Sequence, residues 1–270
     1  ITTVSPSYAE EIQTAYYGER LDGLLRARRN SLSGVLNGID MQEYDPAADP
    51  LIPAHYSAQD LSGRAQCKAA LQQSLGLTVD PSVPIIGMVG RLSSQKGLDL
   101  VDHVIGQIME ENVQLVVLGM GESRYVNLFS WAEQQYPGRV AARFQMDHQL
   151  AHRIYAGADM FLMPSQFEPC GLSQMIALRY GTIPIVRKTG GLTDTVADCG
   201  DGRGNGFTFA TYNADDMAGA IERAITAYHQ PAVWSELVHR AMLSDHSWKQ
   251  PAAQYIKLYR AMVQPEESPV

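Results

Sequence analysis

Two cations on one short loop have the residue types and the spacing that binding of a diphosphate needs. Arg91 and Lys96 follow the apolar run Ile85–Val89 within the segment G-R-L-S-S-Q-K-G. Arginine offers a planar fork of donors to phosphate oxygens, and lysine adds a compact positive charge. The segment is not a Walker loop, because no Gly-Lys-Ser/Thr follows at the required distance. On spacing alone, a phosphate-binding pair and two ordinary surface cations fit the loop equally well.

A carboxylate stands on a second loop, at the end of another apolar run. The run Met160–Met163 stops at Pro164, and the next loop carries Glu168 before Gly171 opens a stretch of helical periodicity. A parallel strand ending here places the carboxylate and several main-chain N–H groups at the carboxyl edge of a sheet, where α/β folds bind ligands. A lone glutamate on a loop is ordinarily only solvated, so its position before a glycine-led helix is what singles it out.

Two glycine-rich turns are further candidates for anion contacts. The segment 188–192, K-T-G-G-L, lets the main chain approach an anion closely, although an ordinary strand-to-helix turn fits it as well. The segment 119–121, G-M-G, begins like a dinucleotide-binding fingerprint, but Arg124 stands where the third glycine belongs, so NAD is not expected. The sequence contains no Asp-x-Asp pair. We therefore expect no metal-bridged diphosphate, and predict no metal or cofactor.

The elements that must position these loops follow from alternating strand and helix signals. Apolar runs of strand length alternate with stretches of helical periodicity between Ile85 and His229. This alternation predicts an α/β fold with a Rossmann-like parallel sheet and helices on both faces. The expected strands are 85–89, 114–118, 140–144, 160–163, 183–186 and 206–209. The expected helices are 98–111, 123–135, 150–156, 171–180 and 214–229.

The two ends of the chain carry fewer signals. Ser5–Ser7, with Pro6 near the first helical position, predicts the start of a helix that runs to Tyr17. Arg26–Arg29 is a basic cluster of the kind typical of a solvated face. The remaining segments are expected to be loop at 41–63 and helix at 65–75 and 248–262.

Composition and charge argue against several classes of partner. Of the 270 residues, 45% are hydrophobic and 19% are charged, as is ordinary for globular proteins. A formal net charge of −8 without a basic stripe argues against nucleic acid. The apolar stretches have the length of strands, so no membrane partner is predicted, and residues 1–3 start no signal peptide. Three widely spaced cysteines indicate neither a disulfide framework nor a zinc site, and favour a reducing cytoplasm.

Several ordered segments carry a resemblance to a known family. They are T-V-S-P-S-Y-A-E-E-I from Thr3, N-G-I-D from Asn37, G-R-L-S-S-Q-K-G-L-D from Gly90, D-H-Q-L-A-H-R from Asp147, E-P-C-G-L from Glu168 and T-G-G-L from Thr189. Together they resemble the bacterial glycogen synthases and plant starch synthases, which are retaining, ADP-glucose-dependent glucosyltransferases of the GT-B type. The resemblance covers nearly all of the 270 residues.

The resemblance implies the nucleotide-sugar-binding C-terminal domain, one half of a GT-B-type two-domain glycosyltransferase. Residues 1–245 are expected to form this donor domain, and residues 246–270 a helix and tail that pack on the absent N-terminal domain. The start without methionine, inside what reads as structure, agrees with a piece of a longer protein. The implied reaction transfers glucose from ADP-glucose to the non-reducing end of an α-1,4-glucan with retention, in a bacterial cytoplasm or a plastid stroma. The acceptor is expected to contact mainly the absent domain.

The same resemblance implies a role for each candidate residue. By similarity, Arg91 and Lys96 hold the donor phosphates and stabilise the departing ADP. Glu168 lies against the donor sugar, where it holds hydroxyls or stabilises positive charge at the anomeric carbon. The other implied substrate contacts are the main chain of Cys170, Gly171 and Leu172 for the glucose hydroxyls, Ser173 for the distal phosphate, and Thr189 and Gly190 for phosphate.

This sequence departs from the family pattern at two positions. Met146 stands where the family usually has an aromatic residue beside adenine, although a methionine sulfur also packs on rings. Ile176 stands where the wider retaining GT-B group often has a second glutamate on the ribose, as fits the glycogen-synthase branch. His152, on the segment that borders the adenine in the family, is expected to be structural rather than catalytic.

Three alternatives stay open beside this interpretation. One is a noncatalytic nucleotide- or glycan-binding module that kept the fold. Another is a phosphorylase-like enzyme, which would need a lysine-linked pyridoxal phosphate. The third is a glucosyltransferase that uses UDP-glucose as donor. On the main interpretation, the chain alone is expected to bind ADP or ADP-glucose and to transfer little or no glucose.

Overall fold

A six-stranded parallel sheet forms the centre of the protein in a computed structural model that describes residues 1–263, with Asp201 described by its main chain only. The strands lie in the order β5-β4-β3-β6-β7-β8. Their bounds are β3 Ile85–Val89, β4 Gln114–Leu118, β5 Val140–Arg143, β6 Met160–Met163, β7 Ile183–Arg187 and β8 Phe207–Phe209. Every neighbouring pair is parallel, which confirms the predicted sheet, including its sixth strand.

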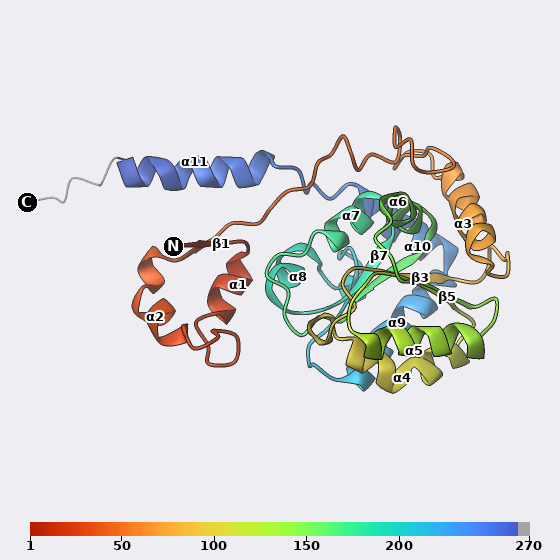
Figure 1. Ribbon diagram of the computed structural model, residues 1–270. Coiled ribbons are helices and arrows are strands. Elements are labelled where there is room, and N and C mark those ends of the chain that lie inside the picture. The colour runs from red at the N-terminus through yellow and green to blue at the C-terminus, as the bar shows by residue number, and fades with distance from the viewer. Residues whose placement is uncertain (264–270) are drawn as a thin grey trace, which may run out of the picture.

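Helices cover both faces of this sheet (Figure 1). Alternate residues of each strand serve different faces: Ile85 and Val116 pack in one cluster with Leu71 and Ile154, whereas Ile86 and Leu115 join a larger cluster. The helices flanking the sheet are α3 Ser62–Leu75, α4 Leu98–Glu110, α5 Ser123–Gln135, α6 His148–Gly157, α7 Ser173–Arg179, α9 Ala214–Tyr228 and α10 Pro231–Met242. Because both faces are buried, the strands read as continuous apolar runs.

The N-terminal segment forms a small unit beside the sheet. It contains β1 Thr2–Thr3, α1 Pro6–Glu11, α2 Asp22–Ala27, the 3₁₀ turn η1 Arg29–Ser31 and β2 Ser33–Gly34. Ser5 caps α1 with Pro6 at the first helical position, as predicted. The unit docks through α1 on α8, Gly190–Thr195, where Asp194 accepts hydrogen bonds from the hydroxyls of Ser5 and Ser7.

The predicted extent of this first helix was wrong. Helix α1 ends at Glu11 rather than at Tyr17. The Thr14 hydroxyl donates to the Glu11 carbonyl at 2.7 Å, and the Thr14 N–H donates to the same carbonyl at 2.9 Å, three residues back. A short polar side chain therefore takes over the carbonyl that a continuing helix would use. Helices α2 and α10 were not predicted.

The last described helix, α11 Lys249–Val263, extends away from the sheet (Figure 1). Its only buried residue is Pro251. Ile256, Tyr259 and Met262, each three residues from the next, are 50%, 58% and 72% exposed and form an apolar stripe that residues 1–263 leave uncovered. Among the helices formed by residues 1–263, none combines the length and the apolar character that crossing a membrane requires.

Candidate functional site

The order in which successive strands are added to the sheet reverses between β3 and β6. From β3 the chain moves outward to β4 and β5, and from β6 it moves outward in the opposite direction to β7 and β8. The loops that leave the carboxyl ends of β3 and β6 therefore diverge, and open α/β sheets bind ligands at such points. The β3 loop carries Arg91 and Lys96, and the β6 loop carries Glu168. Topology alone thus brings the two predicted halves of the site to one place.

A direct ion pair joins the two loops. Lys96 Nζ lies 2.6 Å from Glu168 Oε2, and the same carboxylate oxygen accepts a hydrogen bond from Ser165 Oγ at 3.0 Å. Glu168 is only 7% exposed, so its charge depends on these partners. The pair fixes the carboxylate at the sheet edge. Ser165 was not predicted as a site residue, and no motif in the sequence singled it out.

Hydrogen bonds to main-chain groups connect the same two loops. Gln95 donates from Nε2 to the Phe167 carbonyl at 2.5 Å, and its own carbonyl accepts from the Gln166 N–H at 2.9 Å. Gly97, the N-cap residue just before α4, has φ +73°, and a Cβ there would lie 1.9 Å from the Pro164 carbonyl oxygen. Only glycine fits this position, because both the dihedral angle and the space exclude a side chain.

Arg91 lies on the open side of this arrangement. It is exposed and lines a cavity of about 200 Å³ together with Lys96 and Ser173. Within residues 1–263, the Arg91 side chain makes no hydrogen bond or ion pair, so its guanidinium is available to an anion. The structure thus places Arg91, Lys96 and Ser173 around one cavity, with Glu168 bonded to its lysine.

The loop after Glu168 presents main-chain groups at the same edge. Gly171 has φ +70°, and the Cys170 and Gly171 carbonyls accept from Gln174 Nε2 at 3.0 Å each. In the part of the chain that the structure describes, the N–H groups of Cys170, Gly171 and Leu172 donate to no other group. Burial raises the pKa of the Cys170 thiol, which keeps it protonated and unsuited to act as a nucleophile.

Thr189 and Gly190 are already engaged by a carboxylate. Glu11 accepts from Thr189 Oγ1 at 3.0 Å and from the Gly190 N–H at 2.8 Å. A Cβ on Gly190 would lie 2.1 Å from the Glu168 carbonyl oxygen, so this turn borders the site. Sequence reasoning missed Glu11, although its motif was quoted, because only the docking of α1 on α8 brings it here. The role of Thr189 and Gly190 as phosphate contacts stays a prediction.

Met146 and His152 lie at the start of α6. Met146 is 92% exposed and precedes Asp147, which caps the helix. His152 is 1% exposed, and its Nδ1 lies 2.7 Å from Asp49 Oδ2, a contact that fixes the ring. Burial opposes ionisation of Asp49, but hydrogen bonds from Tyr180 and His152 outweigh it and hold the pKa of that carboxyl below its usual value.

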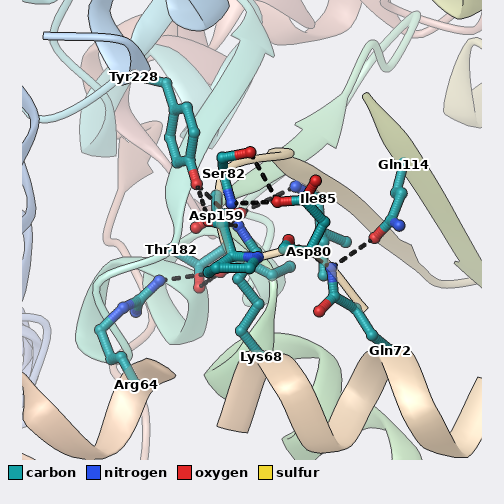
Figure 2. A network of polar contacts seen from close by, with 12 residues as sticks. Arg64, Lys68, Gln72, Asp80, Ser82, Ile85, Gln114, Asp159, Thr182 and Tyr228 are labelled. Carbon is teal, nitrogen blue, oxygen red and sulfur yellow. Dashed lines mark hydrogen bonds and ion pairs between the residues drawn. The ribbon is translucent and has the colours of Figure 1, made fainter. Parts of the chain in front are cut away.

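A larger cavity, about 620 Å³, lies between α3, α9 and α10, at the amino ends of β3 and β6. Figure 2 shows the polar network beside it, in which Lys68 reaches toward Asp159 and Tyr228. Lys68 Nζ lies 2.8 Å from both Asp159 Oδ2 and Tyr228 Oη, and Asp159 also accepts from the Ile85 N–H at 2.9 Å. These groups satisfy one another, so the network reads as structural, and the smaller cavity at the carboxyl edge is the better candidate site.

Comparison with known proteins identifies the family of this chain. A family profile described as "Glycosyl transferases group 1" matches residues 76–238, and one described as "Starch synthase catalytic domain" matches residues 1–27. The chain belongs to the group 1 glycosyl transferases. It is also homologous to bacterial glycogen synthases, with 56% identity to that of Geobacillus thermodenitrificans over 99% of the chain and 52% to that of Bacillus cereus strain B4264 over 98%. In each case, this glycosyl transferase chain spans 56% of the relative's length.

A solved structure matches this glycosyl transferase over almost its full length. The catalytic domain of starch synthase IV from Arabidopsis thaliana, bound to ADP and acarbose, superposes with a TM-score of 0.92 at 42% identity, covering 97% of this chain and 56% of that one. Sucrose-phosphate synthase from Thermosynechococcus elongatus, at 22% identity and a TM-score of 0.65, shares the fold. The predicted fold, a parallel α/β half of a GT-B-type glycosyltransferase, is confirmed.

Proposed function

We propose that this chain is the donor-binding half of a glycogen or starch synthase, which transfers glucose from ADP-glucose to the non-reducing end of an α-1,4-glucan with retention. The observation that carries the proposal is the contact of 2.6 Å between Lys96 Nζ and Glu168 Oε2. It lies between β3 and β6, where the strand order reverses, and beside Arg91, whose side chain has no partner within residues 1–263. Two cations and one carboxylate at a single cavity suit a sugar joined to a diphosphate.

The chemistry of glucosyl transfer explains why these charges are needed. Breaking the bond between glucose and diphosphate builds negative charge on the departing ADP and positive charge on the anomeric carbon. Arg91 and Lys96 stabilise the leaving group, and Glu168 holds the sugar and faces its developing positive charge. Removing one such preorganised contact typically costs about 2–4 kcal/mol of transition-state stabilisation. The free N–H groups of Cys170, Gly171 and Leu172 suit sugar hydroxyls, and Ser173 in the cavity suits the distal phosphate.

The relatives support both the reaction and the nucleotide. The glycogen synthases reach 56% identity, and the starch synthase structure at 42% identity was solved with ADP and acarbose. ADP supports ADP-glucose over UDP-glucose as donor, and acarbose, a glucan-like ligand, supports an α-1,4-glucan acceptor. The bacterial relatives favour a bacterial cytoplasm over a plastid.

Calorimetry on the purified 270-residue chain tests the donor site directly. We expect ADP and ADP-glucose to bind at one site, UDP-glucose to bind more weakly, and Lys96→Ala to lose most of the affinity. Tighter binding of UDP-glucose would select that alternative donor, and failure of all three ligands to bind would refute the proposal.

A transfer assay separates this proposal from its rivals. The chain alone is expected to transfer negligible glucose from ADP-glucose to glycogen, because acceptor contacts are assigned to the other half of the enzyme. Strong transfer by the chain alone contradicts that assignment, whereas an inactive full-length protein that still binds ADP identifies a noncatalytic module. Visible absorption by a lysine-linked pyridoxal phosphate would instead identify a phosphorylase-like enzyme.

A further inference from the structure

Two histidines and a glutamate converge beside the first turns of α6. His148 and His152 are four residues apart on this helix, so both side chains lie on one face. Glu43 reaches them from the turn after Asp40. One potential ligand atom from each of the three side chains lies within 4.8 Å of the others, and His148 Nε2 is 3.6 Å from Glu43 Oε1.

His152 is the fixed member of this group. The side chain is 1% exposed, and Nδ1 is held 2.7 Å from Asp49 Oδ2, which also accepts from the Tyr180 hydroxyl at 2.5 Å. Its second nitrogen, Nε2, is buried and has no hydrogen-bond partner within the described chain. Buried polar atoms nearly always have a partner, so this nitrogen requires an explanation.

The contact with Asp49 defines what the unpartnered nitrogen can do. A carboxylate at Nδ1 holds the proton on that nitrogen, which leaves a lone pair on Nε2. Metal-binding histidines are oriented in this way, by a carboxylate or carbonyl on the nitrogen away from the metal. His152 therefore has the tautomer and the second contact of a metal ligand.

We propose that Glu43, His148 and His152 bind a divalent transition-metal ion, zinc above all. Two imidazoles and one carboxylate are a ligand set that suits zinc. Metal–ligand bonds of about 2.0–2.1 Å at tetrahedral angles place ligand atoms roughly 3.3 Å apart, close to the 3.6 Å that separates His148 from Glu43. Both of these side chains are exposed and free to adjust, whereas His152 is fixed. Three protein ligands leave a fourth position open to water.

Metal bound here would join two separate parts of the chain. The segment that contains Glu43 and Asp49 already contacts α6 through the Asp49–His152 bond and through Tyr44, whose ring stacks on His152 with a centroid distance of 5.1 Å. The ion would add a link at the amino end of α6. Neither the cysteine spacing nor the absence of an Asp-x-Asp pair could indicate this site, because its ligands are a glutamate and two histidines that only the fold brings together.

Cobalt titration of the metal-stripped 270-residue chain tests the site. Four-coordinate Co²⁺ with nitrogen ligands absorbs strongly in the visible range, so one equivalent should produce these bands and Zn²⁺ should abolish them. Loss of the group that orients a ligand already weakens metal affinity by about 10–100-fold. His148→Gln and Glu43→Gln, which remove ligands at exposed positions, are therefore each expected to weaken cobalt binding by at least about tenfold.

Matched controls distinguish this site from adventitious binding. His103→Gln, an exposed histidine on α4, and Cys199→Ser, the least buried cysteine, should leave the cobalt spectrum and affinity unchanged. Circular dichroism and thermal unfolding of the apo forms should show that His148→Gln and Glu43→Gln remain folded. The proposal is overturned if no visible bands appear at excess Co²⁺, if either ligand variant binds as tightly as the parent, or if Cys199→Ser or His103→Gln abolishes binding.

Discussion

Lys96 and Glu168 balance each other's charge before any ligand is present. At 2.6 Å, with Glu168 buried, each depends on the other as a partner. A diphosphate competes with Glu168 for Lys96, and Arg91 has no such competitor within residues 1–263. Arg91 is therefore suited to the first contact with the phosphates, and Lys96 to the contact that strengthens as charge develops on the leaving group.

Lys96→Ala in the full-length enzyme is expected to lower kcat/KM for ADP-glucose by about a hundredfold or more, as loss of one preorganised charge contact does. Steady-state kinetics with glycogen as acceptor measures this. Lys188→Ala removes an exposed lysine near the same sheet edge and should change kcat/KM little. Equal losses in the two variants would mean that net charge, rather than the Lys96 contact, matters.

Glu168→Ala is expected to lower turnover far more than ADP affinity, because in the proposed function Glu168 faces the sugar, and its removal frees Lys96 for phosphate. Calorimetry with ADP and turnover with ADP-glucose measure the two effects separately. Glu168→Gln keeps the shape and should show the same split. Loss of ADP binding in either variant would exclude the proposed role.

At the scale of elements, the approach of α4 to the end of β6 depends on Gly97. We expect Gly97→Ala to lower the free energy of unfolding by at least about 1–3 kcal/mol, because a side chain at φ +73° is strained and would meet the Pro164 carbonyl. Gly106→Ala, inside α4 with open space around it, should instead stabilise the protein by about 0.5–1 kcal/mol. Urea unfolding measures both, and equal effects would refute the argument.

His246 connects the exit from α10 to the segment before α3. Its carbonyl accepts from the Ile39 N–H at 2.9 Å, and its ring nitrogen Nε2 is buried without a partner in the described chain. Burial lowers the pKa of this imidazole, against the opposing charge of Asp245, so the folded state holds it neutral. The unfolded chain protonates it below about pH 6.5.

Stability should therefore fall as the pH drops below about 6.5, since the unfolded state gains this proton at a higher pH than the folded state does, with a slope for this group no steeper than about 1.4 kcal/mol per pH unit. Denaturant unfolding at pH 7.5 and 5.5 measures the difference. His246→Gln should reduce the difference relative to the parent. An unchanged difference would assign the pH dependence to other groups.

For the molecule as a whole, the apolar runs were enough to predict the sheet, because strands buried on both faces contain few polar residues and so form nearly continuous apolar runs. The run Ile85–Val89 and the run Met160–Met163 became β3 and β6 with the predicted bounds. The motifs also placed Arg91 and Glu168 at one edge. The sequence could not predict contacts that form only when α1 packs on α8. The Gly190 N–H donates to Glu11, 179 positions away in the sequence, and no local pattern indicates a contact at that separation.

Helix α11 gives a test at this scale. Deleting residues 249–270 from the chain is expected to leave the free energy of unfolding within about 0.5 kcal/mol and ADP affinity unchanged, because the helix buries only Pro251. The same deletion in the full-length enzyme should destabilise it if, as we propose, the stripe of Ile256, Tyr259 and Met262 packs on the other domain. A large loss in the isolated chain would show that α11 stabilises the sheet domain itself.

The contact between the Glu11 carboxylate and the Gly190 amide bears on how the proposed donor would bind. Glu168 pairs with Lys96 in the same way, so two of the proposed anion-binding groups, the Gly190 N–H and Lys96, already contact a carboxylate of the protein. Loading a nucleotide sugar is then an exchange of one anion for another, so its net affinity is a difference between two strong attractions. If the proposed transfer takes place here, the return of Glu11 and Glu168 to these contacts after glucose departs would help to release the nucleotide.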